Sequence, residues 1–241
     1  MWSIKEVRPG IRVGFTDTAA GNLAFHVGDD PDAVTARRRA VEELLAGGGA
    51  PPTLAYMNQV HGADVALAAA VRRGRGAPAA DAMVDATAPP GTGLAVMVAD
   101  CVPVVLVGDA SGRGPVVAVA HAGRPGVEAG VIDAVVAGMR QAGADTIEAW
   151  LGPSVCGRCY EVPDAMRAAV AGQVPEAFAT TSRGTPALDL PAAVLAQLAG
   201  NGVDAHASGI CTLEDPRYFS HRRSQRDGEA EGRFIGFVAA T

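Results

Sequence analysis

The sequence predicts an α+β fold in which mixed β-sheets are flanked by helices. Short apolar runs typical of strands and amphipathic runs of helical period follow one another in a mixed pattern. Glycine and proline, with 30 and 16 residues, separate these runs. Because no long linker or internal repeat divides the 241 residues, we expect residues 1–241 to form a single domain.

The elements are predicted in order along the chain. Residues 11–15 alternate like a strand, and Asp30 and Pro31 suit the N-cap and first position of an amphipathic helix that glycines 47–49 end. Further strands are predicted at 53–60, 94–99, 102–107, 116–120, 147–151 and 234–239. Helices are predicted at 127–141, 163–171 and 190–199. The runs from 94 to 120 are apolar enough to be buried on both faces.

Charge and composition exclude several classes of function. With 20 Lys and Arg against 26 Asp and Glu, the net charge is −6, so we expect no nucleic-acid partner. Lys5 is the only lysine, which excludes a P-loop lysine and a buried Schiff-base lysine. The first six residues lack a signal-peptide pattern and no apolar run is long enough to span a bilayer, so we expect a cytoplasmic protein without a membrane partner.

Two histidines and a cysteine stand where apolar runs end or break: His61, Cys101 and His121. Functional side chains collect on loops at strand ends. Forty residues separate the first pair and twenty the second, too far apart for a zinc finger. Two imidazoles and one thiolate match the three protein ligands of a catalytic zinc ion. From spacing alone, a buried thiol and ordinary polar histidines remain the alternative.

Other polar residues in the same part of the sequence could act together with these three. Gln59, Asp81 and Asp100 are candidates for proton transfer or for support of the histidines, with loop capping as the alternative. Arg124 stands just before a predicted helix, whose N–H groups and added positive charge would favour an anion such as phosphate.

A set of ordered motifs along most of the chain resembles the YfiH/LACC1 family, also named polyphenol oxidase or multicopper laccase-like. The motifs are residues 58–62, 80–84, 98–104, 121–123, 152–153, 160–162, 211–212 and 215–223. The resemblance implies a CNF1/YfiH-like fold and a purine nucleoside phosphorylase that acts on adenosine, inosine and methylthioadenosine and deaminates adenosine. It also implies zinc, with copper as the other candidate metal, held by residues matching His61, Cys101 and His121.

Substrate-binding residues are expected near the ends of these motifs. Arg124 is one, and His221 and Arg223 in the last motif are the others. The chain departs from the family where Arg124 and Pro125 replace its usual Trp-Arg, which bears on phosphate contact. The resemblance leaves the oligomeric state open. We expect no functional role for His26 and His206.

Two cysteine features are left without a functional assignment. Cys156 and Cys159 have the spacing of a redox or zinc-ribbon pair, but the chain has no second such pair, so we interpret this segment as a structural loop. Cys211 is interpreted as a buried thiol.

Rival functions use the same residues. A cysteine hydrolase would take Cys101 as nucleophile and His121 as base, without a metal. A copper-dependent polyphenol oxidoreductase is the other alternative, but a four-copper oxidase needs about ten histidines, and this chain has five.

Overall fold

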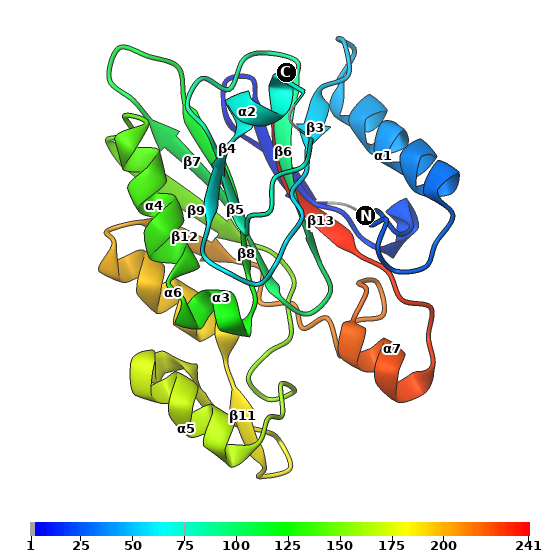
Figure 1. The fold of residues 1–241 in the computed structure, drawn as a ribbon, viewed down its shortest axis with the longest axis vertical. Coiled ribbons are helices and arrows are strands. Elements are labelled where there is room, and N and C mark those ends of the chain that lie inside the picture. Colours follow the sequence, from blue (N-terminus) through cyan, green and yellow to red (C-terminus); the bar gives the residue numbers. More distant parts are fainter. Residues whose placement is uncertain (1–2, 75) are drawn as a thin grey trace.

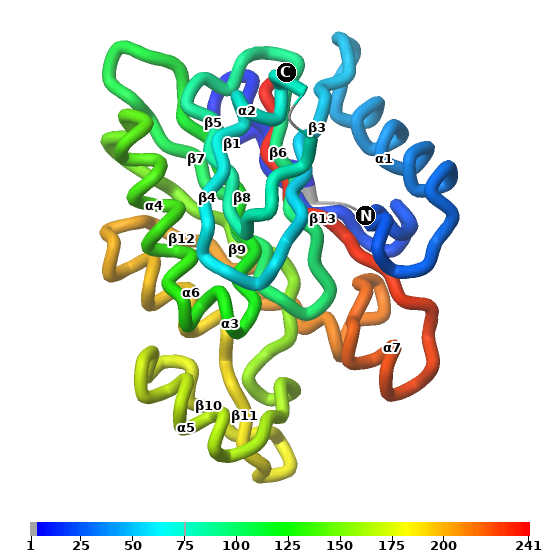
Figure 2. Tube along the Cα trace, viewed as in Figure 1, coloured from blue at the N-terminus to red at the C-terminus, as the bar shows by residue number. Residues whose placement is uncertain are grey.

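Two packed β-sheets form the centre of the fold in the computed structural model, which describes residues 3–74 and 76–241 (Figure 1). The first sheet has the order β1-β2-β13-β6-β3, with β3 parallel to β6 and the other neighbours antiparallel. Its strands are β1 (Ser3–Arg8), β2 (Ile11–Phe15), β13 (Phe234–Ala240), β6 (Thr92–Val98) and β3 (Thr53–Ala55). Figure 2 shows the C-terminal strand β13 lying beside the N-terminal strand β2.

The second sheet has the order β12-β9-β7-β8-β5-β4, antiparallel in the middle and parallel at both edges. Its strands are β12 (Asp204–Ala207), β9 (Thr146–Leu151), β7 (Val102–Asp109), β8 (Val116–Ala122), β5 (Ala82–Asp85) and β4 (Val65–Leu67). A small ribbon of β10 (Phe178–Thr180) and β11 (Pro186–Leu188) lies apart from both sheets. The predicted α+β fold with mixed sheets is therefore confirmed.

The side-chain alternation of the strands explains the layered packing. In β7, Val105 and Val107 face the space between the sheets, whereas Val104 and Leu106 face the opposite side. Strand β6 behaves alike: Val96 packs between the sheets, and its neighbours pack on the outer face. Because successive residues of a strand point to opposite faces, continuous apolar runs are the sequence of strands covered on both sides.

Helices cover the outer faces of the two sheets (Figure 1). Helix α1 (Pro31–Leu45) packs on the first sheet through Val41 and Leu45. It begins as predicted, with Asp30 accepting the Asp32 N–H at the N-cap. Helices α4 (Val131–Gln141) and α6 (Leu190–Gly200) pack on the second sheet, with α5 (Asp164–Gln173) beyond them. The short helices are α2 (Ala68–Arg72), α3 (Arg124–Glu128), α7 (His221–Asp227) and the 3-10 turns Thr18–Ala20 and Pro175–Ala177.

Two predicted elements differ from the structure. The strand expected at 53–60 ends at Ala55, because the following residues form an irregular loop that leads to His61. The helix expected at 127–141 is two helices, α3 and α4, separated at Gly130, whose φ of 80° interrupts the helix. The second difference moves the helix start to Arg124, directly after the motif that carries His121.

Within the described part of the chain, no helix combines the length and apolar character needed to cross a membrane. Met1 and Trp2, at the start of the stretch without a signal-peptide pattern, lie outside the described residues.

Candidate metal centre and cavity

The loop that carries His61 is held by one buried carboxylate, that of Asp81. Its oxygens accept the backbone N–H groups of Val60 at 3.1 Å, His61 at 2.9 Å and Gly62 at 2.7 Å. His61 itself has a φ of 61°, in the left-handed region that a non-glycine residue rarely adopts. The three hydrogen bonds therefore hold a backbone shape that the loop sequence would not favour alone.

Asp81 also fixes the ring of His121, near the end of β8. Oδ1 of Asp81 lies 2.8 Å from Nδ1 of His121, and both side chains are buried. The backbones are joined as well, since the His121 N–H donates to the Asp81 carbonyl at 2.7 Å. Because an ionised carboxylate only accepts, Nδ1 carries a proton, and Nε2 is the nitrogen that can bind a metal ion once it has lost its own proton.

Cys101 lies in the connection that crosses from β6 of the first sheet to β7 of the second. Asp100 enables this tight crossing with a φ of 82°. Its carboxylate accepts the Thr212 hydroxyl at 2.6 Å and the Arg222 N–H at 2.8 Å. The crossing is thereby tied to the C-terminal part of the chain.

These three segments bring His61, Cys101 and His121 together. One nitrogen or sulfur atom of each lies within 4.8 Å of the others, and the two imidazole rings meet edge to face with centroids 4.7 Å apart. Gly123 keeps the space between them open, because a Cβ there would lie 3.0 Å from His61 Cδ2 and 3.1 Å from Cys101 Sγ. The predicted cluster thus exists as a possible metal site.

The chemistry of these groups fits a transition-metal ion. One thiolate and two imidazoles form a donor set suited to zinc or copper, and the carboxylate on His121 is a common partner of a metal-bound histidine. Burial alone would raise the pKa of Cys101, but the neighbouring His121 and His61 overcome it and lower the pKa to about 6. Burial would lower the pKa of His121, yet Cys101 and Asp81 raise it to about 9.

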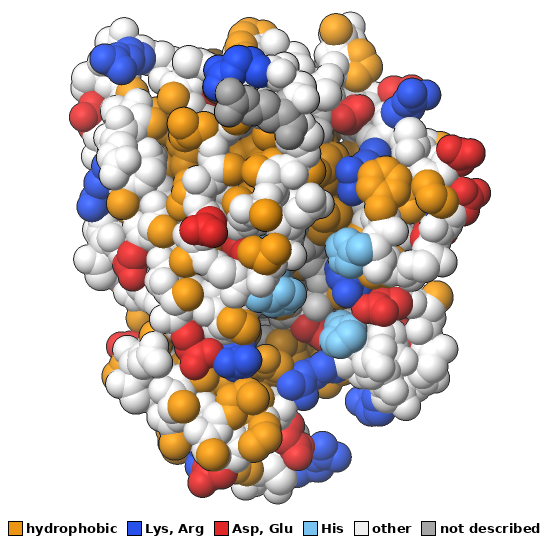
Figure 3. Space-filling model, viewed as in Figure 1, with side chains coloured by type: hydrophobic (Ala, Val, Ile, Leu, Met, Phe, Trp, Pro, Cys, Tyr) orange, Lys and Arg blue, Asp and Glu red, His pale blue; other side chains and the backbone are white. Residues whose placement is uncertain are grey.

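A cavity of about 460 Å³ opens beside the cluster. Positively charged or titratable side chains gather around it, and histidines with arginines nearby are visible near the middle of the face in Figure 3. Those lining the cavity besides the cluster are His26, Asp100, Arg124, Tyr160, His221, Arg222 and Arg233. The site therefore combines a soft donor cluster with an anion-attracting wall.

The arginines of this wall are held in different ways. Arg124, at the start of α3, pairs with Glu128 one turn later. The guanidinium of Arg222 lies over the ring of Tyr160, 4.3 Å from its centroid. Arg233 donates to Glu231, which also contacts Nδ1 of His221 at 2.9 Å.

Not every predicted site residue reaches the cavity with a free polar group. Gln59 lines it, but its amide is bonded to both the N–H and the carbonyl of Met97. Asp81 does not line it. Arg223 does not line it either, because its guanidinium donates to the carbonyls of Thr212 and Tyr218.

Four titratable lining residues were not predicted from the sequence: His26, Tyr160, Arg222 and Arg233. Tyr160 and Arg222 stand inside family motifs, which was the available signal. His26, interpreted from the sequence as an ordinary polar residue, lines the cavity, where burial and then Arg233 lower its pKa. His206 is exposed on β12, bonded to Glu148 and stacked on Trp150.

The sequence and the fold have counterparts in known proteins. Residues 12–241 match the family described as multi-copper polyphenol oxidoreductase laccase. This chain belongs to that family, the YfiH family. A purine nucleoside phosphorylase of Streptomyces coelicolor is 49% identical to it over 235 residues, covering 92% of this chain and 94% of the relative. The resemblance stated from the motifs is confirmed, while the extent of the domain over 1–241 stays a prediction.

Solved structures of the YfiH family share the fold. A Neisseria meningitidis protein of family DUF152 superposes with a TM-score of 0.82 at 30% identity, covering 99% of this chain and 98% of its own. YfiH of Bacillus licheniformis superposes with a TM-score of 0.80 at 25% identity, covering 100% of this chain and 96% of its own.

Replacing Asp81 by Asn tests its positioning role. An amide has one acceptor oxygen, and its NH₂ group would face the N–H donors of the His61 loop. We expect about 10–100-fold weaker binding of Zn²⁺ at the cluster. The readout is the zinc concentration that half-protects Cys101 from iodoacetamide, measured by peptide mass spectrometry.

The matched control is Asp85→Asn, four residues away on β5. Asp85 is also buried, but its carboxylate accepts from Arg72 and Thr87 instead of the cluster. This variant should have a lower free energy of unfolding, but the zinc concentration that half-protects Cys101 should stay unchanged. An unchanged midpoint in Asp81→Asn would contradict the role of Asp81.

The pH dependence of alkylation tests the environment of Cys101 in metal-free protein. Because its pKa is lowered to about 6, the thiolate is present above that pH and is lost as pH falls through it. The alkylation rate of Cys101 should therefore reach half its plateau near pH 6, and His121→Gln should move this midpoint upward. Cys159, whose pKa is raised by burial and by Cys211, should show no plateau below pH 9. If the alkylation midpoint of Cys101 in the wild type lay near the ordinary pKa of a thiol, the interaction of Cys101 with His121 would be disproved.

Proposed function

We propose that this protein is a zinc-dependent purine nucleoside phosphorylase that acts on adenosine, inosine and methylthioadenosine and also deaminates adenosine. The observation that carries the proposal is the opening of the His61, Cys101 and His121 cluster into a cavity with a cationic wall. The Streptomyces coelicolor relative, named a purine nucleoside phosphorylase, supports it. Purine nucleosides and phosphate are the expected small-molecule partners.

Phosphorolysis requires phosphate to be held against the ribose. An oxygen of phosphate forms a bond to C1′ while the C1′–N9 bond breaks, and the electron pair of that bond leaves with the purine. In this chain Arg124 and Arg222 supply the positive charge for the phosphate, since guanidinium groups match its oxygens. The pairing of Arg124 with Glu128 holds it at the cavity in place of the family's usual Trp-Arg.

The departing purine needs a proton to leave as a neutral base. His221 lines the cavity, and Glu231 holds its Nδ1, which leaves Nε2 as the nitrogen that faces a substrate. We assign His221 to binding the nucleoside and to delivering this proton. Tyr160 also lines the cavity, and its ring lies under the guanidinium of Arg222, which holds Arg222 at the cavity wall.

Zinc would be held by His61, Cys101 and His121, with copper as the alternative occupant. A bound zinc ion supplies a Lewis acid that acidifies water, and deamination uses water to add at C6 as ammonia leaves. The residues around the cluster orient these groups: Asp81 fixes His121 and the His61 loop.

Gln59, Asp81 and Asp100 therefore have positioning roles in this proposal. Gln59 ties the His61 loop to β6, and Asp100 ties Cys101 to the segment that carries Arg222. Arg223 fixes the start of α7 and acts on the substrate only through its neighbours. We keep the expectation of a cytoplasmic protein without nucleic-acid or membrane partners.

A second candidate is a metal-free cysteine hydrolase. Asp81, His121 and Cys101 follow one another in the order orienting acid, base and nucleophile. The hydrolase mechanism assigns no role to His61, although three backbone hydrogen bonds from its loop to Asp81 position it. For that reason the hydrolase ranks second.

Product analysis separates the two functions. With adenosine and phosphate, the zinc-loaded protein should form adenine, ribose 1-phosphate and inosine, and removal of the metal should abolish all three. Cys101→Ser should lower both rates by at least about 100-fold through loss of the metal. Gly172→Ala, at an exposed position of α5 with open space around it, should leave them unchanged.

Full phosphorolysis in Cys101→Ser would remove the zinc mechanism. Chelator-resistant cleavage of esters or amides, without turnover of adenosine, would instead favour the hydrolase.

A further inference from the structure

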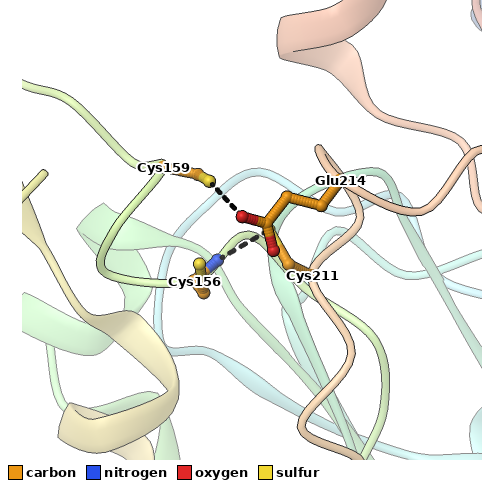
Figure 4. Close-up of side chains that lie close together, drawn as sticks. All are labelled: Cys156, Cys159, Cys211 and Glu214. Carbon is orange, nitrogen blue, oxygen red and sulfur yellow. Dashed lines mark hydrogen bonds between the residues drawn. The ribbon is translucent and has the colours of Figure 1, made fainter. Parts of the chain in front are cut away.

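A second group of metal-binding side chains lies outside the candidate centre. Cys156 and Cys159 come from the loop after β9, and Cys211 and Glu214 come from the segment before α7 (Figure 4). One sulfur or oxygen atom of each lies within 4.8 Å of the others. From the sequence, the segment with Cys156 and Cys159 was interpreted only as a structural loop, because no second pair of ligands was evident. The structure places Cys211 and Glu214 beside them as such a pair.

The two halves of the group have the same local shape. The N–H groups of residues 159 and 160 both donate to the Cys156 carbonyl, at 2.9 and 3.0 Å. In the other half, the N–H groups of residues 214 and 215 both donate to the Cys211 carbonyl, at 3.2 and 2.9 Å. Each turn therefore presents two donor side chains three residues apart, the spacing by which paired cysteines grip zinc.

Backbone pairing sets the two turns face to face. Ser154 and Cys211 form a parallel bridge, in which the Ser154 N–H donates to the Ile210 carbonyl and the Thr212 N–H donates to the Ser154 carbonyl, each at 3.1 Å. The Cys156 N–H points to Cys211 Sγ at 3.4 Å, a contact that favours a thiolate. The arrangement is thus set by backbone hydrogen bonds before any ion binds.

The fourth position belongs to Glu214. Its Oε1 lies 3.4 Å from Cys159 Sγ, and its other oxygen lies 3.8 Å from the exposed Arg158. An exposed ion pair of this length is weak, so Arg158 does not commit the carboxylate.

We propose that Cys156, Cys159, Cys211 and Glu214 bind a second, structural zinc ion. Four protein ligands close the coordination sphere, which distinguishes this site from the three-ligand cluster at the cavity. Three thiolates select a soft or borderline metal over magnesium or calcium. A disulfide would use two of the thiols and leave the third, and Glu214, without a partner.

The second ion would join two walls of the cavity. Cys159 precedes Tyr160, and the Cys211 turn leads through Thr212, whose hydroxyl bonds to Asp100, to the segment that carries Arg222. The Val155 N–H, next to Cys156, donates to the Asp100 carbonyl at 3.0 Å. Binding of the ion would therefore fix the positions of Tyr160 and Arg222 relative to the β6–β7 connection that carries Cys101.

The experiment uses the full chain with Cys101→Ser, under reducing conditions. The chain has four cysteines, so any thiolate-to-metal signal in this variant comes from the proposed site. We expect about two zinc ions per wild-type chain and about one per Cys101→Ser chain. Cobalt in place of zinc should give the variant an intense near-ultraviolet thiolate band. Zinc at about 100 times its Kd should raise the melting temperature by about 5–10 °C.

Two further variants locate the ion. Adding Cys159→Ser should abolish the band and the thermal shift, and adding Glu214→Gln, at an exposed position, should weaken zinc binding while the chain stays folded. Two outcomes would overturn the proposal. In the first, the folded Cys101→Ser protein binds no zinc and shows no cobalt band. In the second, two of its three thiols form a disulfide, and reduction of that disulfide does not restore metal binding. These readouts do not depend on nucleoside turnover.

Discussion

The buried carboxylate of Asp81 is the constraint on which the candidate site depends. A charge fully removed from water must be compensated by donors, and here three N–H groups of the His61 loop and the ring of His121 provide them. Burial would raise the pKa of Asp81, yet these donors, His121 first, lower it. Compensating one charge therefore positions two of the three cluster residues.

The packing of the two sheets positions the third. Cys101 lies where the chain leaves β6 in one sheet and enters β7 in the other, beside the end of β8 that carries His121. Because both strands are covered on each face by apolar side chains, the crossing cannot shift without exposing the core. Residues forty and twenty positions apart in the chain meet because the sheets meet there.

Patterns of apolar residues and caps predicted much of this fold, whereas contacts made only in the folded chain were not predictable. Helix α1 and the central strands follow directly from the Asp30 cap and from continuous apolar runs. The short helix α7 carries no apolar period, so it was not predicted. Its residues Arg222 and Arg223 stand side by side in the motif, but adjacent helical residues point about 100° apart, and only Arg222 reaches the cavity. His26 and Arg233 lie in loops, so no periodic pattern in the sequence could predict that they reach the cavity.

The most direct test of the central claim is an anomalous diffraction map at the zinc edge from crystals grown with zinc. The account predicts a peak bonded to one nitrogen of His61, to Nε2 of His121 at about 2.0–2.1 Å and to Cys101 Sγ at about 2.3 Å. Asp81 should remain on Nδ1 of His121. A map without density in bonding range of Cys101 and His121 would contradict the account.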